Sequence, residues 1–484
     1  MKEFVLPFSV LAVPSIGQEV RKGEKQIRKV APNRKEPSFF EYVKSTMRMA
    51  KFAALDLPAV FIAQMLPEKA AKYVTYRVFT SNGLLVMKLG QFLSTRPEVL
   101  SESGAESLLA LQRAAPVPRA ANVYEEFRKE TGEHLPEGSV GPMIGAGCIS
   151  QVVKLSVKGK EYAIKIVHSE AVQEMQTDLW VFRKFSSLLG FGRFIDEFGE
   201  MITKQLDLRN EKRNTEKFRE NFRFYRSLEE DGSAFNWLLS KIRKYSFIFP
   251  NPVIATKNML VTEYWPGTYT ETAENKKHAK ESLLFLFLHM VFKDKHIHAD
   301  LHPGNIAHRS GKDKATVVYD SGLAHTISDR QRKNLLDLLQ EMLLGNVERA
   351  VLLLIDRNPR NTHSEDQKRK VVGDVKRALG VRGSRAESKE AEKGPKSAQI
   401  DKRGPGSALI QVSAAIRRNN VFFDECYTNI VMSTMYVQNS ALSGEYTYPW
   451  ARIAAKSGLG KEYTRLLARR IAKKYVNYDF AANR

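Results

Sequence analysis

Cysteine is scarce in this sequence, which has two among 484 residues, Cys148 and Cys426. Two thiols can build neither a disulfide framework nor a cysteine-rich zinc site, and their scarcity fits a reducing compartment. Long apolar runs are also missing. The two best runs, Leu55–Leu66 and Leu283–Phe292, are shorter than the roughly 18 residues that a membrane span needs, and polar residues interrupt both. We therefore expect no transmembrane helix and assign both runs to buried helices.

Acidic residues are the third shortage. The chain has 54 of them against 76 lysines and arginines, which gives a formal net charge of +22. Such a charge favours anionic partners, among them nucleotides and acidic lipid headgroups, although a basic organelle matrix would favour the same balance. Nucleic acid is disfavoured because the cations are spread along the chain and no recognition motif accompanies them. A hydrophobic content of 43% indicates a globular protein.

Changes in composition divide the chain into four parts. Residues 1–37 form a basic leader that we expect to be loose, and residues 38–135 form a helical extension. Strand patterns and glycines mark a small lobe with a helical insert over residues 136–265. Residues 266–484 form a larger, mostly helical lobe. Within it, residues 380–406 mix charges of both signs without apolar spacing, which predicts a disordered insert.

Short apolar segments and one long charged segment predict the elements of the two lobes. The charged stretch Gln205–Phe222 has helical spacing and predicts one continuous helix. The apolar segments predict strands over Tyr162–Val167, Phe247–Ile254, Asn258–Glu263 and Ala315–Tyr319.

The sequence HADLHPGN, residues 298–305, is followed by DSG at residues 320–322. Phosphoryl transfer from ATP needs a carboxylate near the acceptor, an amide oxygen on one Mg²⁺ and a second carboxylate on the metal ions. In kinases the first two are five residues apart on one loop, and the third opens a short motif ending in glycine. Asp300, Asn305 and Asp320 have this spacing. We predict Asp300 as the catalytic carboxylate, and Asn305 and Asp320 as ligands of Mg²⁺.

A different chemistry is open to the same segment. His298, Asp300 and His302 alternate, and alternate residues of a strand share one face, where they could bind a metal ion. Pro303-Gly304 favours a loop instead of a strand. The metal-ligand hypothesis also leaves the later asparagine and aspartate without a role.

A glycine-containing turn precedes the Tyr162–Val167 strand. Backbone N–H groups of such a turn can approach phosphates, and a lysine on the following strand can pair with the α- and β-phosphates. Glycine alone is weak evidence because turns use it freely, but here the turn lies at the expected distance from an Ala-x-Lys strand. The predicted nucleotide-binding residues are Gly145, Ala146, Gly147, Val152, Ala163 and Lys165.

Two further segments complete the predicted site. Glu211 lies on the predicted charged helix, where a kinase places the glutamate that pairs with the strand lysine, so we predict an ion pair with Lys165 and a catalytic role. The sequence LVTEYWPG, residues 260–267, is typical of a hinge. We expect the backbone of Glu263 and Trp265 to contact adenine.

With these motifs in order, the chain resembles the UbiB (aarF-domain) family of atypical kinases. That family has an N-terminal K-x-G-Q motif, present here as Lys88, Gly90 and Gln91, and an E-x-D motif, present as Gln205 and Asp207. The HxDxHPGN string matches in full. The matching motifs extend from about residue 88 to residue 322, roughly half of the chain.

The resemblance implies an α+β, protein-kinase-like two-lobed fold with an N-terminal helical extension over the active site and a mostly helical C-terminal lobe. It implies that the K-x-G-Q helix occupies the place where a protein substrate would enter. Family members typically act as ATPases or small-molecule kinases with ATP and Mg²⁺, and are associated with coenzyme Q (ubiquinone) biosynthesis and lipid homeostasis. They occur in bacteria, mitochondria and plastids.

Three positions depart from the family pattern. Gly145-Ala-Gly147 replaces an alanine-rich loop, which could relax the family's inhibition of phosphotransfer. Gln205 replaces the first acid of E-x-D and cannot pair with Lys88 as an anion. Ser321 replaces the aromatic residue of D-F-G but leaves the metal-ligand position intact. None of these changes removes a predicted catalytic group.

These observations favour an ATP-dependent atypical kinase or ATPase that supports coenzyme Q biosynthesis or lipid homeostasis. The alternative is a nucleotide-binding scaffold that recruits partners through a basic surface, and a metal-dependent hydrolase is the third hypothesis. The expected partners are nucleotide, a lipid or quinone-type small molecule, and an anionic membrane surface or a biosynthetic complex. The expected location is a mitochondrion or plastid in a eukaryote, and the cytoplasm or the membrane periphery in a bacterium.

Overall fold

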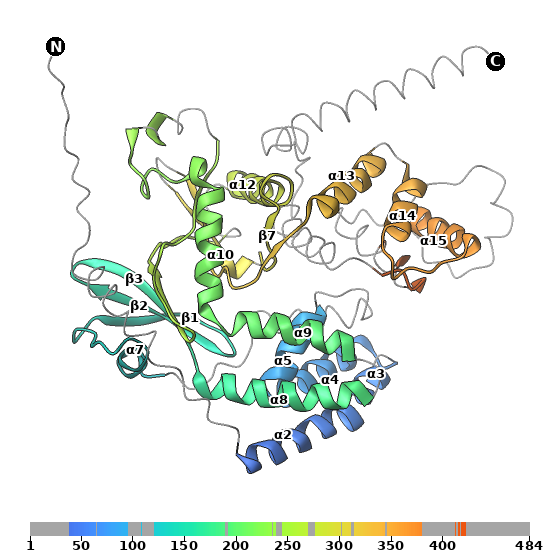
Figure 1. Ribbon diagram of the computed structural model, residues 1–484, viewed down its shortest axis with the longest axis horizontal. Coiled ribbons are helices and arrows are strands. Elements are labelled where there is room, and N and C mark those ends of the chain that lie inside the picture. The colour runs from blue at the N-terminus through green and yellow to red at the C-terminus, as the bar shows by residue number, and fades with distance from the viewer. Residues whose placement is uncertain are drawn as a thin grey trace. The chain divides into compact units, whose positions relative to one another are not determined.

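The computed structural model describes two compact units (Figure 1). Unit 1 combines the chain up to Ala50 with Ala115–Glu216 and Pro250–Tyr264, and unit 2 combines Lys51–Ala114, Lys217–Phe249 and the chain from Trp265. The predicted leader and the predicted insert lie outside the described residues, and the predicted four-part division stays a prediction. The described residues are 38–94 except 64, 108, 121–188, 192–269 except 235 and 239–243, 276–379 except 302, 311–313 and 344–345, and 412, 415–416 and 418–422.

Helices dominate the described part of the N-terminal extension, as the spacing predicts. They are α2 Phe39–Lys51, the π-helical turn η1 Phe52–Asp56, α3 Leu57–Ala63, α4 Glu68–Ser81 and α5 Leu84–Ser94.

The prediction that Leu55–Leu66 is buried is wrong. Leu55, Phe61 and Ile62 are 65%, 63% and 64% exposed, whereas Val60 and Ala63 are buried. A helix that packs on one side buries only the stripe that faces its neighbours. Here Val60 and Ala63 lie on that stripe, and the apolar residues outside it stay in solvent.

An antiparallel five-stranded sheet forms the centre of unit 1. Its order is β1 Val140–Ala146, β2 Ser150–Val157, β3 Lys160–Val167, β6 Met259–Glu263 and β5 Pro252–Ala255. Lys158 and Gly159 join β2 to β3 with φ angles of 50° and 76°, values that suit the twist of a two-residue hairpin. Alternate side chains of β2 and β3 are buried against Val123 and Phe127 of α7 Val123–Thr131. The opposite face of these strands is less buried.

Helices α8 Ser169–Leu188 and α9 Gly192–Gln205 run side by side in unit 1 (Figure 1). The prediction of one helix over Gln205–Phe222 is wrong, because α9 ends at Gln205 and α10 spans Leu208–Asn221. Asp207 lies in the break. Its carboxylate accepts from the N–H of Arg209 at 3.1 Å and its carbonyl from the N–H of Asn210 at 2.9 Å. Aspartate favours this helix-starting geometry over a helix interior.

The predicted strand Phe247–Ile254 is also two elements. β4 Ser246–Ile248 pairs in parallel with β9 Ala315–Val318 in unit 2, whereas β5 pairs with β6 in unit 1. Pro250 lies between them and has no N–H for a strand ladder, so the chain leaves one sheet before it enters the other.

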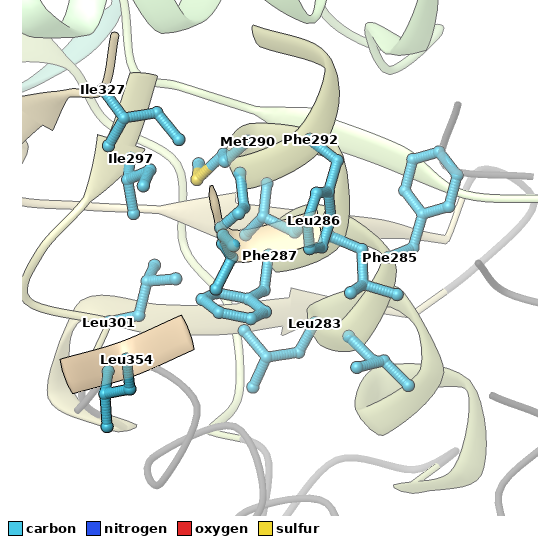
Figure 2. Close-up of a cluster of buried hydrophobic side chains, with 14 of the residues drawn as sticks. Leu283, Phe285, Leu286, Phe287, Met290, Phe292, Ile297, Leu301, Ile327 and Leu354 are labelled. Atoms are coloured by element: carbon cyan, nitrogen blue, oxygen red, sulfur yellow. The ribbon is translucent and has the colours of Figure 1, made fainter. Parts of the chain in front are cut away.

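Unit 2 has a helical core. Helix α12 Lys276–His289 and the π-helical turn η3 Met290–Asp294 are buried along their apolar run, which confirms the prediction for Leu283–Phe292. Figure 2 shows Leu283, Leu286, Phe287 and Met290 of this run gathered with residues from other elements, among them Ile297, Leu301, Ile327 and Leu354.

The remaining elements of unit 2 surround this core. β7 His296–His298 pairs with β10 Ala324–Thr326, and β8 Ile306–Arg309 forms a hairpin with β9. Short 3₁₀ turns span Arg223–Tyr225 and Pro303–Asn305. Helices α13 Asp329–Leu343, α14 Val347–Asp356 and α15 Glu365–Ala378 pack in succession (orange in Figure 1).

Candidate functional site

One row of residues crosses four strands of the unit 1 sheet. Gly145 is opposite Val152, Val152 is opposite Lys165, and Lys165 is opposite Leu260. Directly opposed residues of antiparallel strands point to the same face, and Ala163 shares that face because it is two residues from Lys165. The sheet therefore brings Gly145, Val152, Ala163 and Lys165 together on the face opposite α7.

Two residues of this face were missed by the sequence analysis. Leu260 completes the row beside Lys165, and Thr262 is opposite Ala163. Both belong to β6, for which the hinge motif drew attention to the last residue alone. The alternation of the Asn258–Glu263 strand could have identified them, since Leu260 and Thr262 are one repeat apart.

The glycine turn joins β1 to β2. Gly147 donates its N–H to the Ser150 carbonyl at 2.8 Å, and neither Gly145 nor Gly147 has a positive φ. A Cβ added at Gly145 would lie 3.6 Å from the Val152 Cβ, and one added at Gly147 would lie 3.6 Å from the Ser150 hydroxyl. Both are ordinary contacts, so the fold does not require glycine at either position. Close approach of a phosphate to the backbone would explain why glycine occupies these two positions.

Lys165 and Glu211 form an ion pair, with 2.8 Å between Nζ and Oε2. The lysine side chain is 16% exposed and that of the glutamate 6% exposed, so water screens the pair weakly. Glu211 lies in the first turn of α10, the helix that begins after Asp207. The predicted contact is confirmed, and the catalytic role of the two residues stays a prediction.

In unit 2, the ring of His298 bridges two backbone segments. Its Nδ1 accepts the N–H of Asp300 at 3.1 Å, so Nε2 carries the proton and donates to the Tyr319 carbonyl at 3.4 Å. The Asn305 side-chain amide donates to the Asp300 carbonyl at 3.0 Å, and Tyr319 donates its N–H to the Asn305 carbonyl at 2.8 Å. Asp300, Asn305 and the residue before Asp320 are thus held in one network.

The oxygen atoms of this network suit a hard cation. The NH₂ group of Asn305 donates to Asp300, which leaves the amide oxygen as the atom that can bind a metal ion. Asp320 is exposed, has φ of 40°, and accepts the N–H of Gly322 at 3.2 Å. Carboxylate and amide oxygens are ligands of Mg²⁺, so the residues fit the predicted ion.

The histidine metal-ligand hypothesis does not fit this geometry. β7 ends at His298 and Asp300 lies in a turn, so the strand alternation does not hold. Both ring nitrogens of His298 are engaged in hydrogen bonds. His302 lies outside the described residues. Within the part of the chain that the structure describes, no group of three or more His, Cys, Asp or Glu could hold a metal ion.

The hinge segment crosses the boundary between the units, which falls between Tyr264 and Trp265. Glu263 donates its N–H to the Asn251 carbonyl at 3.0 Å, and the Trp265 carbonyl accepts from the Tyr319 hydroxyl at 2.5 Å. The predicted adenine contacts of Glu263 and Trp265 therefore concern their other backbone groups, and they stay predictions.

Lys88 and Gln91 lie on one half-buried stripe of α5, and Gly90 is buried. Among the residues that the structure describes, the buried side-chain oxygen of Gln205 has no hydrogen-bond partner. Burial by itself would raise the pKa of Asp207, but hydrogen bonds from Arg209 outweigh it and hold that pKa below its usual value. The predicted place of Lys88, Gly90 and Gln91 where a protein substrate would enter stays a prediction.

The family model for the ABC1 atypical kinase-like domain matches residues 111–353, half of the chain. The chain belongs to this family. The matched segment contains the glycine turn, the Lys165–Glu211 pair and the network around His298, and the family assignment confirms the predicted two-lobed, kinase-like α+β fold.

Curated relatives of this ABC1 domain are distant. An uncharacterised protein of Synechocystis is 26% identical over 58% of this chain and 71% of its own length. A Shewanella loihica protein named "Probable protein kinase UbiB" is 25% identical over 52% of this chain and 47% of its own. A Dictyostelium discoideum protein named as a serine/threonine-protein kinase is 24% identical over 59% and 42%. The chain thus spans about half the length of most of these relatives.

Solved structures align over much of the chain at low similarity. The erythromycin complex of a Mycobacterium tuberculosis protein covers 80% of this chain and 99% of its own, with 17% identity and a TM-score of 0.39. The Rio2 kinase complex with ADP, Mg²⁺ and phosphoaspartate from Chaetomium thermophilum covers 86% and 98%, with 13% identity and a TM-score of 0.26. Among the described helices, none has the length and apolar character to cross a membrane.

Proposed function

We propose that this ABC1-domain protein is an atypical kinase or ATPase of the UbiB type that binds ATP with Mg²⁺. The observation that carries the proposal is the network around His298. A single imidazole ring joins the backbone of Asp300 to the backbone that precedes Asp320, and Asn305 bonds to both segments. A merely structural loop has no need to join the backbone of Asp300 to the backbone before Asp320 in one network.

Unit 1 and unit 2 each hold groups that suit this chemistry. In unit 1, Lys165 contacts the α- and β-phosphates, and Glu211 fixes the lysine at 2.8 Å. In unit 2, Asn305 and Asp320 hold Mg²⁺, which neutralises phosphate charge when it is bound. Asp300 orients the acceptor hydroxyl and accepts its proton. Most of the rate enhancement would come from positioning and from electrostatic stabilisation by these residues.

The acceptor that we propose is a small molecule of the lipid or quinone class, which connects the activity to coenzyme Q biosynthesis or lipid homeostasis. Lys88, Gly90 and Gln91 support this choice, since the K-x-G-Q helix would exclude a polypeptide acceptor from the groove. The family relation supports the connection to the coenzyme Q pathway. Mitochondrial or plastid location in a eukaryote, or the membrane periphery in a bacterium, belongs to the same proposal.

We propose that the protein binds such an acceptor at an anionic membrane surface. Phe39, Phe40, Val43 and Met47 form an exposed apolar stripe on α2, with exposed fractions between 39% and 81%. In the sequence, seven lysines and arginines fall within residues 21–35, directly before this helix. Aromatic and apolar side chains beside a run of cations are typical of peripheral attachment to acidic lipid headgroups.

The alternative is a nucleotide-binding scaffold that does not turn over ATP and recruits partners through its basic surface. The net charge of +22 favours it. The complete set of predicted catalytic groups favours the enzyme.

The test is ATP turnover by the full chain, measured as phosphate release with and without Mg²⁺. Vesicles of phosphatidylcholine, with or without an anionic lipid and a quinone head-group analogue, are added in parallel. We expect Mg²⁺-dependent turnover that rises with anionic vesicles or the analogue and is lost in Asp300→Asn. Nucleotide binding without any turnover would favour the scaffold. Absence of nucleotide binding would contradict both functions.

A further inference from the structure

Tyr319 makes three hydrogen bonds to three different parts of the unit 2 site. Its N–H donates to the Asn305 carbonyl at 2.8 Å, and its carbonyl accepts from His298 at 3.4 Å. Its hydroxyl donates to the Trp265 carbonyl at 2.5 Å, across 54 residues of sequence. Tyr319 also directly precedes Asp320. One residue therefore contacts the hinge at Trp265 and both ends of the HADLHPGN segment, His298 and Asn305, and it is bonded covalently to Asp320.

The hinge segment from Trp265 onward also contacts β8, the first strand of the β8–β9 hairpin that leads to Tyr319. Arg309 of β8 donates to the Pro266 carbonyl at 2.8 Å, and its guanidinium lies 5.3 Å from the centre of the Trp265 ring. Thr268 and His308 exchange two backbone hydrogen bonds of 2.9 and 2.7 Å. Several hydrogen bonds thus join the hinge to the hairpin, whose second strand β9 ends directly before Tyr319.

Gly267 shows how close the two segments are. A Cβ at this position would lie 2.9 Å from the Ala307 side chain and 3.2 Å from the His308 carbonyl. Only glycine allows this approach without a shift of the hairpin.

Asp320 needs this support because its backbone is strained. A non-glycine residue at φ of 40° costs free energy and persists where its surroundings fix it from several sides. The Tyr319 backbone bonds hold Asp320 from the N-terminal side, and the Asp320–Gly322 hydrogen bond holds it from the other. A shift of Tyr319 would therefore move the carboxylate.

We propose that Tyr319 is a positioning residue that couples binding of the nucleotide base at the hinge to binding of Mg²⁺ at Asp320. The inference rests on the proposed function and adds a regulation of the same site. When a base contacts the hinge, it fixes the Trp265 carbonyl and with it the Tyr319 hydroxyl. The fixed Tyr319 then holds Asp320 in its metal-binding conformation. By reciprocity, Mg²⁺ at Asp320 strengthens binding of the base.

The variant Tyr319→Phe isolates the hydroxyl. The phenyl ring can still pack against the buried cluster of Ile248, Ala307, Ala315 and Val317, and both backbone hydrogen bonds remain. The hydrogen bond from the hydroxyl to the Trp265 carbonyl is lost. Tyr245→Phe is the matched control, since its hydroxyl donates to Glu281 at 3.1 Å within the same unit and outside the site.

The experiment measures the dissociation constant of ADP for the full chain, with and without Mg²⁺. The ratio of the two constants is the coupling between metal and nucleotide. We expect Tyr319→Phe to reduce this ratio about fivefold or more, with little change in the constant measured without Mg²⁺. Tyr245→Phe should keep the wild-type ratio. Arg309→Met, which loosens the hinge from its other side, should lower the ratio in the same direction.

The outcomes separate this inference from the proposed function. Failure of the wild-type chain to bind ADP at any Mg²⁺ concentration would refute the function itself. If the wild type shows coupling and both Tyr319→Phe and Arg309→Met retain it in full, the role of Tyr319 is refuted. The same holds if Tyr319→Phe weakens ADP equally with and without Mg²⁺, because that is the effect of looser packing alone. A melting curve of each variant establishes that it is folded.

Discussion

At the scale of single residues, the hydrogen bonds that a side chain makes determine which of its atoms can still bind a metal ion or a ligand. His298 has both ring nitrogens engaged, so it positions the loop and cannot bind a metal ion. Asn305 uses its NH₂ group on Asp300 and keeps its oxygen for a cation. Glu211 neutralises Lys165 and holds it in place. Each assignment follows from donor and acceptor chemistry at one side chain.

Gly145→Ala separates a folding role from a binding role. A methyl group at this position meets the Val152 side chain at an ordinary distance, and the backbone φ is not positive. We expect a melting temperature close to that of the wild type, together with weaker ATP binding measured by calorimetry. Gly267→Ala is the contrasting control, because its Cβ would collide with Ala307 at 2.9 Å. A large loss of stability in Gly145→Ala with unchanged ATP affinity would contradict the assignment.

Acid should destabilise unit 2 through buried histidines. Burial, with a contribution from the Lys217 ammonium, lowers the pKa of His296 from 6.5 to about 4. Between pH 6.5 and about pH 4, His296 is protonated in the unfolded chain and neutral in the folded one. Its contribution to the free energy of unfolding is therefore complete above pH 6.5 and is lost as the pH falls toward 4. The loss by about pH 5 is roughly 2 kcal/mol for this residue.

The measurement is denaturant unfolding of the wild type and His296→Gln between pH 7 and about pH 5. The variant should have a flatter pH dependence than the wild type. His134→Gln, at an exposed histidine, should keep the wild-type dependence. Equal slopes in all three proteins would rule out His296 as the source.

At the scale of elements, α2 is fastened to α8 by a buried charge. Asp178 is fully buried and accepts hydrogen bonds from both Ser45, at 2.6 Å, and Arg48, at 2.5 and 2.6 Å. Arg48 also reaches Glu174 of α8 at 2.7 Å. This contact makes the first helix of the extension part of the unit 1 fold.

Arg48→Met should cost about 3–5 kcal/mol, because it leaves the buried Asp178 carboxylate without an opposite charge and with the Ser45 hydroxyl as its remaining donor of this contact. The double variant Arg48→Met, Asp178→Leu should recover part of that loss, since it removes the buried charge as well. Arg223→Met, which breaks an exposed pair with Glu220, should change stability by less than about 1 kcal/mol. Urea unfolding of each variant measures these changes, and a double variant less stable than the single one would contradict the explanation.

Elements were predictable where one local pattern decides them. The Tyr162–Val167 strand and the buried Leu283–Phe292 run follow from periodicity. Gln205–Phe222 was predicted as one helix because its spacing is continuous, whereas a single capping aspartate outweighs that spacing at Asp207. The division between β4 and β5 depends on which sheet each segment joins. Local sequence does not specify strand pairing, so this division could not be predicted.

The site was predictable to the same extent. Motif spacing predicted Asp300, Asn305 and Asp320 as site residues, and the structure links the first two to Tyr319, the residue before the third. The link from Tyr319 to Trp265 spans 54 residues and has no motif, so only the fold reveals it.

At the scale of the whole molecule, we propose that the extension decides which acceptors are admitted. Lys88→Ala should change ATP affinity, ATPase rate or phosphorylation of the protein itself, because Lys88 lies on the K-x-G-Q helix that we expect where a protein substrate would enter, here called the gate. Lys69→Ala, at an exposed lysine of α4, is the control and should behave as the wild type. Wild-type values of all three quantities in a folded Lys88→Ala variant would place the lysine outside the gate.

The central claim is that this chain binds ATP through Mg²⁺ held at Asp320. Calorimetric titration of ATP into the full chain, with and without Mg²⁺, tests it in the wild type and in Asp320→Asn. Loss of one carboxylate charge removes most of the metal affinity while the side-chain shape is kept. We predict that Mg²⁺ strengthens ATP binding at least tenfold in the wild type, a difference of about 1.4 kcal/mol, and that Asp320→Asn loses this gain. An equal gain from Mg²⁺ in Asp320→Asn would contradict the claim.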